Sequence, residues 1–265
     1  MTVQAQPSSK MPRFDPVVIA GLVPFLAVLA AWALAPTLSD IPAYKLPPPE
    51  KVWSAFTDMT LDGSLPSEIW ASLRRLAAGY VLGNLTAIPL GLAIALNRAV
   101  AETMTPVLSF FQSIAGIAWV PLAIIWFGVG QGSVLFVIAN TIFFSSIYST
   151  VIGVQLIPRV LYRAALCHGA SRLDVVTSVV ISGALVQILV GLRTSMAYGW
   201  RALVAAEMIA GTNGIGYMTL EAVQWYQTEI VILGMILIGI LWLALDFLIF
   251  RPIEHVTVRR WGLLA

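Results

Sequence analysis

Six stretches of this chain are apolar over a length that can cross a lipid bilayer. A hydrocarbon core of about 30 Å needs roughly 17 to 25 residues of α-helix, which rises about 1.5 Å per residue. The six windows cover approximately residues 17–35, 76–96, 104–127, 134–154, 185–210 and 230–250. Between them lies no alternating pattern of about ten residues, as in a membrane β-strand. Because backbone groups inside a bilayer must be hydrogen-bonded internally, the sequence predicts an all-α membrane protein, a polytopic bundle of about six transmembrane helices.

Composition excludes several other classes of protein. Only 11% of the residues are charged and 59% are hydrophobic, whereas an ordinary globular domain carries about 25% charged residues, so a soluble enzyme is excluded. A net charge of +2 leaves no basic surface for a nucleic-acid backbone. Cys167 is the single cysteine, and His168 and His255 lie far apart, so neither an intrachain disulfide nor a Cys/His metal cluster is expected. We expect no catalytic residues and no metal site.

Basic residues predict the orientation and the domain plan. If both ends are cytoplasmic, nine basic residues lie inside and four outside, which favours this orientation: Lys10, Arg13, Arg98, Arg159, Arg163, Arg172, Arg251, Arg259 and Arg260 against Lys45, Lys51, Arg74 and Arg75. We therefore predict a cytoplasmic tail over residues 1–16 and a single transmembrane domain over 17–265. An alternative for the first window is a secretory signal cleaved near Ala33-Leu34-Ala35. Because the window exceeds the usual 7 to 15 apolar residues of a signal core, we expect a retained helix.

The longest segment outside the windows, residues 36–75, is external in this orientation. It contains Pro47-Pro48-Pro49 and two amphipathic stretches, 50–59 and 67–75, separated by Asp62-Gly63. We expect both stretches to lie along the outer interface and to brace the bundle.

A second extramembrane segment, residues 159–182, joins the fourth and fifth windows on the cytoplasmic side. Alanines in it favour a helix that a partner can approach closely, and Gly169 can end that helix with a left-handed turn. Ser171 can cap the next helix, with Asp174 at the favourable third position. The segment predicts a helix-turn-helix knob with the core Arg163-Ala164-Ala165-Leu166-Cys167-His168-Gly169-Ala170-Ser171-Arg172.

At these residues the sequence resembles the coupling loop of ABC-importer permeases, known as the EAA motif, with Ala164, Ala165 and Gly169 in the matching places. Arg163 stands where the motif's name puts Glu, and Ser182 stands where many members have Pro. Other stretches resemble the permeases of nitrate, sulfonate, taurine and bicarbonate import systems: Leu46-Pro47-Pro48-Pro49, residues 118–123 and 125–128, Gly191-Leu192-Arg193, Gly199-Trp200, residues 203–208 and 214–217. The resemblance covers nearly the whole chain beyond the N-terminal tail.

The resemblance implies a type I ABC-importer permease fold and a transport subunit rather than an enzyme, in the bacterial inner membrane. It implies three partners: a second copy of the chain, two cytoplasmic ATPase subunits, and a periplasmic or lipid-anchored substrate-binding protein. ATP and Mg would be bound by the ATPase, and this chain has no GxxxxGK[ST] phosphate loop. The implied cargo is a small anion, with taurine or another alkanesulfonate first and nitrate or bicarbonate next. The alternative is a secondary transporter of small anions without an ATPase, although the inverted repeats usual there are not visible.

Function is expected at three places. In the resemblance, residues 163–172 dock in a groove of the ATPase. In the fifth window a charge costs at least about 2.5 to 3.5 kcal/mol in hydrocarbon and so faces protein or water, which makes three charged residues candidates for the translocation pathway. Two tryptophans can narrow this pathway, although tryptophan also anchors helices at the interfaces. The pathway candidates are Arg193, Arg201, Glu207, Trp119 and Trp200.

Arg201 is the sharpest pathway candidate, because a guanidinium pairs well with sulfonate, nitrate or carboxylate. Arg193 and Glu207 share a helix face at different depths, and structural partners could neutralise both of them. The third place is the outer end of the fifth window, where Asn213, Gly214 and Gly216 allow a tight re-entrant turn and form a candidate external gate.

Overall fold

The computed structural model describes residues 24, 27–34, 42 and 44–253, and the regular elements in these ranges are helices. Four helical segments are long and apolar enough to cross a membrane. They are α3 (Ser64–Leu96); α6 (Gln131–Gln155); α9 (Ser182–Ala210), preceded by α8 (Arg172–Asp174) and the π-helix η2 (Val175–Ile181); and α11 (Thr228–Leu245), continued by the π-helix η3 (Asp246–Phe250). These segments correspond to the second, fourth, fifth and sixth windows. Most of the first window lies outside the described residues, although 27–34 are helical.

The third window differs from the single helix that its composition predicts. It covers the last nine residues of α4 (Arg98–Gln112) and, after a break, the short η1 (Gly116–Trp119) with α5 (Val120–Phe127). The helices before and after the break are bent by 89°. Ala115 has extended backbone at the break. Gly116 lies so close to α6 that a Cβ there would be 2.5 Å from Thr141 Oγ1. Packing against α6 therefore accompanies a bend that hydropathy does not reveal.

The segment before α3 also differs from its prediction. The first amphipathic stretch forms α2 (Pro49–Leu61), whereas stretch 67–75 is not a separate segment but the first turns of α3. The boundary lies at Asp62-Gly63, where Gly63 has a φ of 80°. Asp62 accepts a hydrogen bond of 2.8 Å from the Ser64 N–H, and bonding to Ser64 lowers the pKa of this carboxyl.

The core is built by α3, α6 and α9, which pack along much of their lengths. Small residues let the backbones approach closely. A Cβ on Gly79 of α3 would lie 2.5 Å from Ile138 of α6, and one on Gly191 of α9 would lie 2.3 Å from Ser149. A Cβ on Gly199 of α9 would lie 2.6 Å from Cδ1 of Ile142 on α6. Two of the motifs that carry the resemblance, at Gly191 and Gly199, are thus sites of helix contact.

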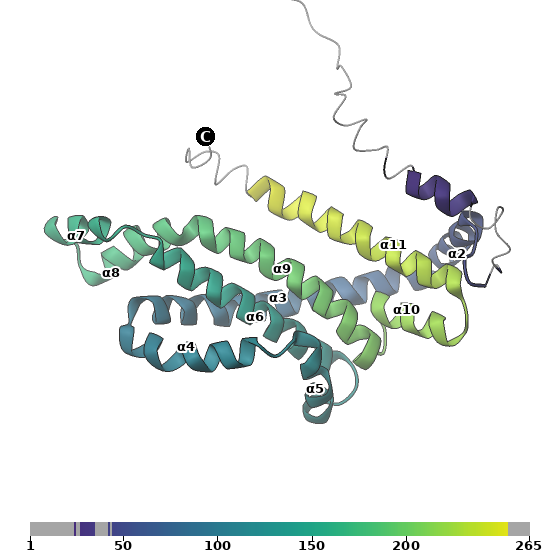
Figure 1. Cartoon of the computed structure of the whole chain (residues 1–265), viewed down its shortest axis with the longest axis horizontal. Coiled ribbons are helices and arrows are strands. Elements are labelled where there is room, and N and C mark those ends of the chain that lie inside the picture. The colour runs from purple at the N-terminus through teal and green to yellow at the C-terminus, as the bar shows by residue number, and fades with distance from the viewer. Residues whose placement is uncertain (1–23, 25–26, 35–41, 43, 254–265) are drawn as a thin grey trace, which may run out of the picture.

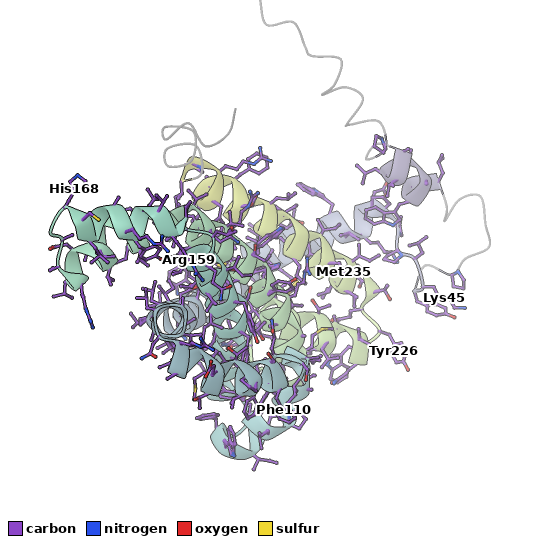
Figure 2. All side chains as sticks on the ribbon, turned by 60° about the vertical axis from the view of Figure 1, so that its left-hand side comes forward. Lys45, Phe110, Arg159, His168, Tyr226 and Met235 are labelled. Atoms are coloured by element: carbon purple, nitrogen blue, oxygen red, sulfur yellow. The ribbon has the colours of Figure 1, made fainter. Side chains whose placement is uncertain are left out.

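The bundle is elongated, and its extramembrane candidates lie at opposite ends (Figure 1). At one end lie α7 (Arg159–Cys167) and α8, and at the other lie α2 and α10 (Ile215–Gln224). Figure 2 shows His168 at the tip of the first end, with Lys45 and Tyr226 on the opposite side. The helix α9 connects the two ends. This placement agrees with the prediction that the segment 163–172 and the candidate gate at residues 213–216 lie on opposite sides of the membrane. Which of the two sides is cytoplasmic stays a prediction.

Candidate functional site

The α7–α8 hairpin, residues 159–174, ends its first helix with a left-handed turn. Gly169 has a φ of 82°. Its N–H donates to Leu166 O at 3.0 Å, and the Ala170 N–H donates to Ala165 O at 3.1 Å. These two bonds form a Schellman motif, which satisfies carbonyls at the helix end and favours glycine at this position. The turn predicted at Gly169 is confirmed.

A capping box begins the second helix of the hairpin. Ser171 Oγ accepts a hydrogen bond of 3.2 Å from the Asp174 N–H, and Asp174 Oδ2 accepts one of 2.9 Å from the Ser171 N–H. The Ser171 hydroxyl lies 2.6 Å from the same carboxylate oxygen. Reciprocal caps of this kind satisfy two otherwise unpaired N–H groups. The predicted cap is confirmed, and both helix ends at the turn of the hairpin have hydrogen-bonded backbone groups.

The hairpin presents apolar side chains that nothing in the described part of the chain covers. Leu166 is 56% exposed and Leu173 is 76% exposed, and α7 contains no buried residue. Arg163 and Arg172 are also exposed. His168 bonds the Ala164 carbonyl through Nδ1 at 2.8 Å. A projecting surface of exposed leucines and arginines is typical of a contact site for another protein.

At the opposite end of α9, Glu207 lies in a buried polar cluster. Glu207 is 0% exposed and Arg75 of α3 is 3% exposed, and Arg75 Nη1 lies 2.7 Å from Glu207 Oε1. Ser72 Oγ lies 2.9 and 2.8 Å from the two carboxylate oxygens. Arg75 also donates to the Asn213 carbonyl at 2.9 Å and to the Asn213 side chain. We call Ser72, Arg75, Glu207 and Asn213 the Glu207 network.

This network also caps the N-terminus of α10. The Ile215 N–H donates to Ser72 Oγ at 2.9 Å, and the Gly216 N–H donates to Glu207 Oε2 at 3.1 Å. The Gly214 N–H donates to the Glu68 carboxylate. Gly214 has a φ of 106°, and a Cβ there would lie 2.3 Å from the Glu207 carboxylate. The structure thus brings Glu207 together with the three predicted gate residues at the turn between α9 and α10.

The part that α3 has in this cluster is not predicted from the sequence. Arg75 is expected among the external basic residues, but in the structure it is buried against Glu207. One available indication was the spacing of Ser72 and Arg75, which places both on one helix face. A second was the rule that a buried carboxylate requires a paired cation or hydrogen-bond donors.

Arg193 has a structural partner that the sequence analysis also missed. Its Nε and Nη2 lie 2.8 and 2.9 Å from the two oxygens of Asp246 at the end of α11. Asp246 is 8% exposed, and Arg251 Nε lies 3.8 Å from it. A bidentate pair of this kind fixes the relative position of two helices. The pair therefore links α9 to α11.

The remaining pathway candidates lie in different surroundings. Trp200 is 4% exposed and packs in the main core, and half-buried Trp119 lies between the rings of Phe111 and Phe136, with centroids 5.8 and 6.3 Å away. Arg201 is exposed, and its guanidinium carbon lies 5.7 Å from the Tyr198 ring centroid. Arg201 thus faces outward while Glu207 and Trp200 face inward. The pathway role of these residues stays a prediction.

No metal centre is formed by the residues that the structure describes, since no group of three His, Cys, Asp or Glu side chains converges there.

Comparisons with known proteins agree on one family. A family model described as binding-protein-dependent transport system inner membrane component matches residues 87–259. The taurine transport system permease protein TauC of Escherichia coli (strain K12) is 34% identical, over 83% of this chain and 82% of its own length. The putative aliphatic sulfonates transport permease protein SsuC of the same organism is 30% identical, over 82% of each chain. The nitrate import permease protein NrtB of Leptolyngbya laminosa is 29% identical, over 86% of this chain and 83% of its own.

A solved structure shares the fold. It is the MetNI methionine ABC transporter in inward-facing conformations, which matches with a TM-score of 0.57 and 15% identity. The match covers 69% of this chain and 94% of that chain. At this identity the match shows a shared fold over that part of the chain.

Proposed function

Because the chain belongs to the family of binding-protein-dependent transport system inner membrane components, we propose that it forms, with a second copy of itself, the pathway of an ATP-driven importer for a small anion. Family membership confirms the predicted all-α permease fold and the transport role, and the family is a transport component rather than an enzyme. The bacterial inner membrane is the proposed location. Two ATPase subunits, which hold ATP and Mg, and a substrate-binding protein outside are the proposed partners.

The cargo proposal is supported by the shared chemistry of the molecules that the relatives' names give. Taurine, aliphatic sulfonates and nitrate appear in the names of relatives that are 34%, 30% and 29% identical to this chain. All are small molecules with an oxyanion group. We place taurine and other alkanesulfonates first, and nitrate or bicarbonate next.

The single observation that carries the coupling mechanism is the exposed α7–α8 hairpin, whose two helices have hydrogen-bonded ends at the turn. Its Schellman motif and capping box leave little freedom for internal adjustment. From α8 the chain continues through η2 into α9 without a break, over residues 172–210. An ATPase groove that binds the hairpin can therefore move α9 as one body when the ATPase dimer closes on ATP. At its other end α9 carries Glu207, so the same movement reaches the turn proposed as the external gate.

The proposed cargo is tested by growth on different sole sulfur sources. A strain deleted for this chain is expected to stop growing on taurine as the sole sulfur source, to grow normally on sulfate, and to recover when the gene is restored. Uptake of radiolabelled taurine is expected to fall with growth. Growth on taurine after deletion, beside normal growth on nitrate as sole nitrogen source, would discard both leading cargoes. Purification of the chain without any ATP-binding subunit, and uptake driven by a proton or sodium gradient, would favour the secondary transporter instead.

Arg201→Ala is expected to slow uptake of the anion by about tenfold. Near a protein surface two unit charges attract by about 4 kcal/mol at 4 Å and by about 1.4 kcal/mol at roughly 12 Å. A tenfold change corresponds to about 1.4 kcal/mol, so it requires attraction at a distance and no direct contact. Arg201→Lys keeps the charge and is expected to keep most of the rate. Arg98→Ala is the matched control, since Arg98 is highly exposed and pairs with Glu102 four residues away. Transport by Arg201→Ala at the parent rate with unchanged cargo preference would remove Arg201 from the pathway.

A further inference from the structure

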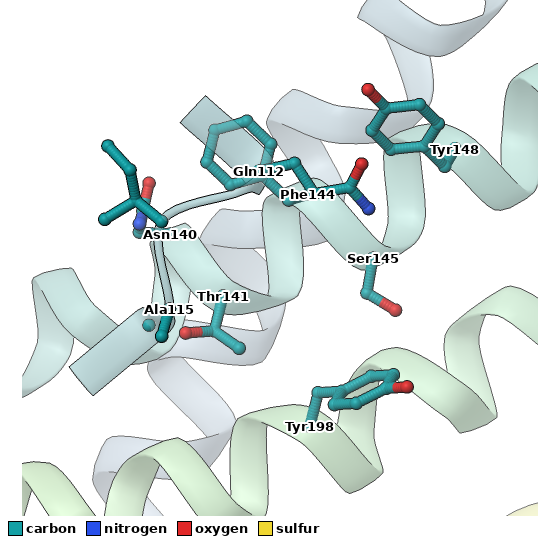
Figure 3. A pocket seen from close by; sticks show the side chains of 10 residues that line it. Gln112, Ala115, Asn140, Thr141, Phe144, Ser145, Tyr148 and Tyr198 are labelled. Carbon is teal, nitrogen blue, oxygen red and sulfur yellow. The ribbon is translucent and has the colours of Figure 1, made fainter. Parts of the chain in front are cut away.

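The break between α4 and α5 borders a pocket that is partly open at the surface of this chain, where Gln112 and Tyr198 in its lining are exposed. The pocket has a volume of about 370 Å³, which is within the roughly 300 to 1,000 Å³ typical of small-molecule sites. Six polar side chains line it, and Figure 3 shows them around the bent segment: Gln112, Asn140, Thr141, Ser145, Tyr148 and Tyr198. We call these six residues the α6 polar pocket. None of them belongs to the Glu207 network or to the hairpin.

The α6 polar pocket is built from three elements. Asn140, Thr141, Ser145 and Tyr148 follow one face of α6 at helical spacing. Tyr198 reaches the pocket from α9, on the side of the pocket opposite the break in Figure 3. The bent segment completes the wall with residues 114–116 and Gln112. The pocket therefore depends on the 89° bend, because residues 112 and 114–116, at the bend, form one of its walls.

Several polar groups of the pocket have unused hydrogen-bonding capacity. Thr141 Oγ1 donates to the Val137 carbonyl at 2.9 Å, and Tyr148 OH shares a 3.1 Å bond with Ser109 Oγ. Within the described ranges, the side chains of Gln112, Asn140 and Ser145 make no hydrogen bond. Unpaired amides and hydroxyls are costly in a membrane protein unless water or a ligand reaches them. Non-helical backbone at membrane depth has the same requirement, since it occurs only inside protein or beside a water-filled cavity.

The uncharged lining of the pocket suits a site that an anion passes through rather than one that binds it tightly. Its lining contains no Lys, Arg, Asp or Glu. A pathway must hold its cargo strongly enough to admit it and weakly enough to release it. Neutral N–H and O–H donors can bond to the oxygens of an anion without the strength of an ion pair. A positive charge nevertheless lies nearby, because the Arg201 guanidinium packs on the ring of Tyr198.

We propose that the α6 polar pocket is the place where the cargo contacts this chain, and that it takes the oxygen atoms of a small oxyanion of the sulfonate type through neutral amide and hydroxyl donors. Arg201 contributes attraction from beyond the Tyr198 ring and does not form the contact itself. The inference rests on the proposed function, since it names the contact site of the same cargo. It adds residues from α4 and α6 that the sequence analysis did not assign to the pathway.

The first test is the reactivity of a thiol placed in the pocket. Ser145→Cys is made in the parent chain, and the labelling of Cys167, the single native cysteine and an exposed one, is subtracted by treating the parent transporter in the same way. The assembled transporter, with its ATPase and binding protein, is treated with the anionic reagent 2-sulfonatoethyl methanethiosulfonate. We expect Ser145→Cys to react and saturating taurine under turnover to slow the reaction at least threefold. Ser54→Cys on α2, far from the pocket and exposed, is expected to react equally with and without taurine.

The second test compares two serines of α6 that lie one turn apart. Ser145 lines the pocket, and its hydroxyl makes no hydrogen bond within the described ranges, whereas Ser149 is outside the lining and donates to the Ser145 carbonyl at 3.1 Å. Ser145→Ala is expected to slow taurine uptake threefold to tenfold, while Ser149→Ala transports at the parent rate. Each substitution removes one hydroxyl, so a selective loss in Ser145→Ala reports the donor that faces the pocket.

The outcomes separate this inference from the proposed function. A parent transporter that accumulates none of taurine, ethanesulfonate and nitrate contradicts the proposed cargo. A parent that accumulates taurine, together with a Ser145→Cys thiol that is unreactive or unaffected by taurine, contradicts the pocket alone. Equal uptake by Ser145→Ala and Ser149→Ala contradicts it as well.

Discussion

Arg75→Ala is expected to destabilise the folded chain by about 3 to 5 kcal/mol, because it leaves the carboxylate of Glu207 buried without its cation. Glu207 is 0% exposed, and its pairing with Arg75 spans 132 residues of sequence. The loss is measured as the unfolding free energy of the detergent-purified protein. Arg74→Ala is the matched control, since Arg74 is the neighbouring residue but is exposed. Exposed substitutions away from such contacts usually change stability by less than about 0.5 kcal/mol.

A double variant distinguishes the lost charge pairing from a general intolerance of the site. Arg75→Met combined with Glu207→Gln removes both charges and keeps an acceptor for the Gly216 N–H. Replacing both members of a buried pair is often close to neutral, whereas removing one is not. We therefore expect the double variant to be more stable than Arg75→Ala. Equal stability of Arg74→Ala and Arg75→Ala, or a double variant less stable than Arg75→Ala, would contradict the role given to the pair.

Gly169→Val is expected to reduce cargo uptake more than tenfold while leaving the chain inserted in the membrane. Gly169 has a φ of 82°, which a β-branched residue adopts only with strain. A Cβ at this position would meet nothing within 4 Å, so the effect comes from the backbone conformation and not from a clash. A turn of another shape would misplace Leu166 and Leu173 on the proposed ATPase contact.

A second substitution at Gly169 distinguishes an effect of backbone conformation from an effect of side-chain size. Asn tolerates the left-handed conformation, and Gly169→Asn is therefore expected to keep more uptake than Gly169→Val. Gly239→Ala is the control for a glycine change, because Gly239 lies inside α11 with nothing within 4 Å of an added Cβ. The readouts are uptake, the amount of copurified ATPase, and the ATP hydrolysis that binding protein and cargo stimulate. Parent uptake in Gly169→Val would remove the hairpin geometry from the coupling mechanism.

Local sequence was sufficient for the hairpin. The turn at Gly169 and the cap between Ser171 and Asp174 depend on residues within a few positions of one another, so spacing alone predicted both. The membrane spans were predictable for a similar reason, because a bilayer requires apolar length and length is a property of the linear chain. The split of stretch 67–75 from α3 was predicted wrongly, since an amphipathic pattern at the start of a long helix resembles a separate short one.

The sequence by itself determined the all-α membrane fold, four of the spanning segments and the hairpin, because hydropathy and helix capping act over short distances along the chain. Only the tertiary structure decided the 89° bend between α4 and α5, the polar pocket beside it, and the partners of the buried charges. Asp246 for Arg193 and Arg75 for Glu207 lie on other helices, 53 and 132 residues away. A buried charge requires some partner, but which residue satisfies it depends on how the helices pack.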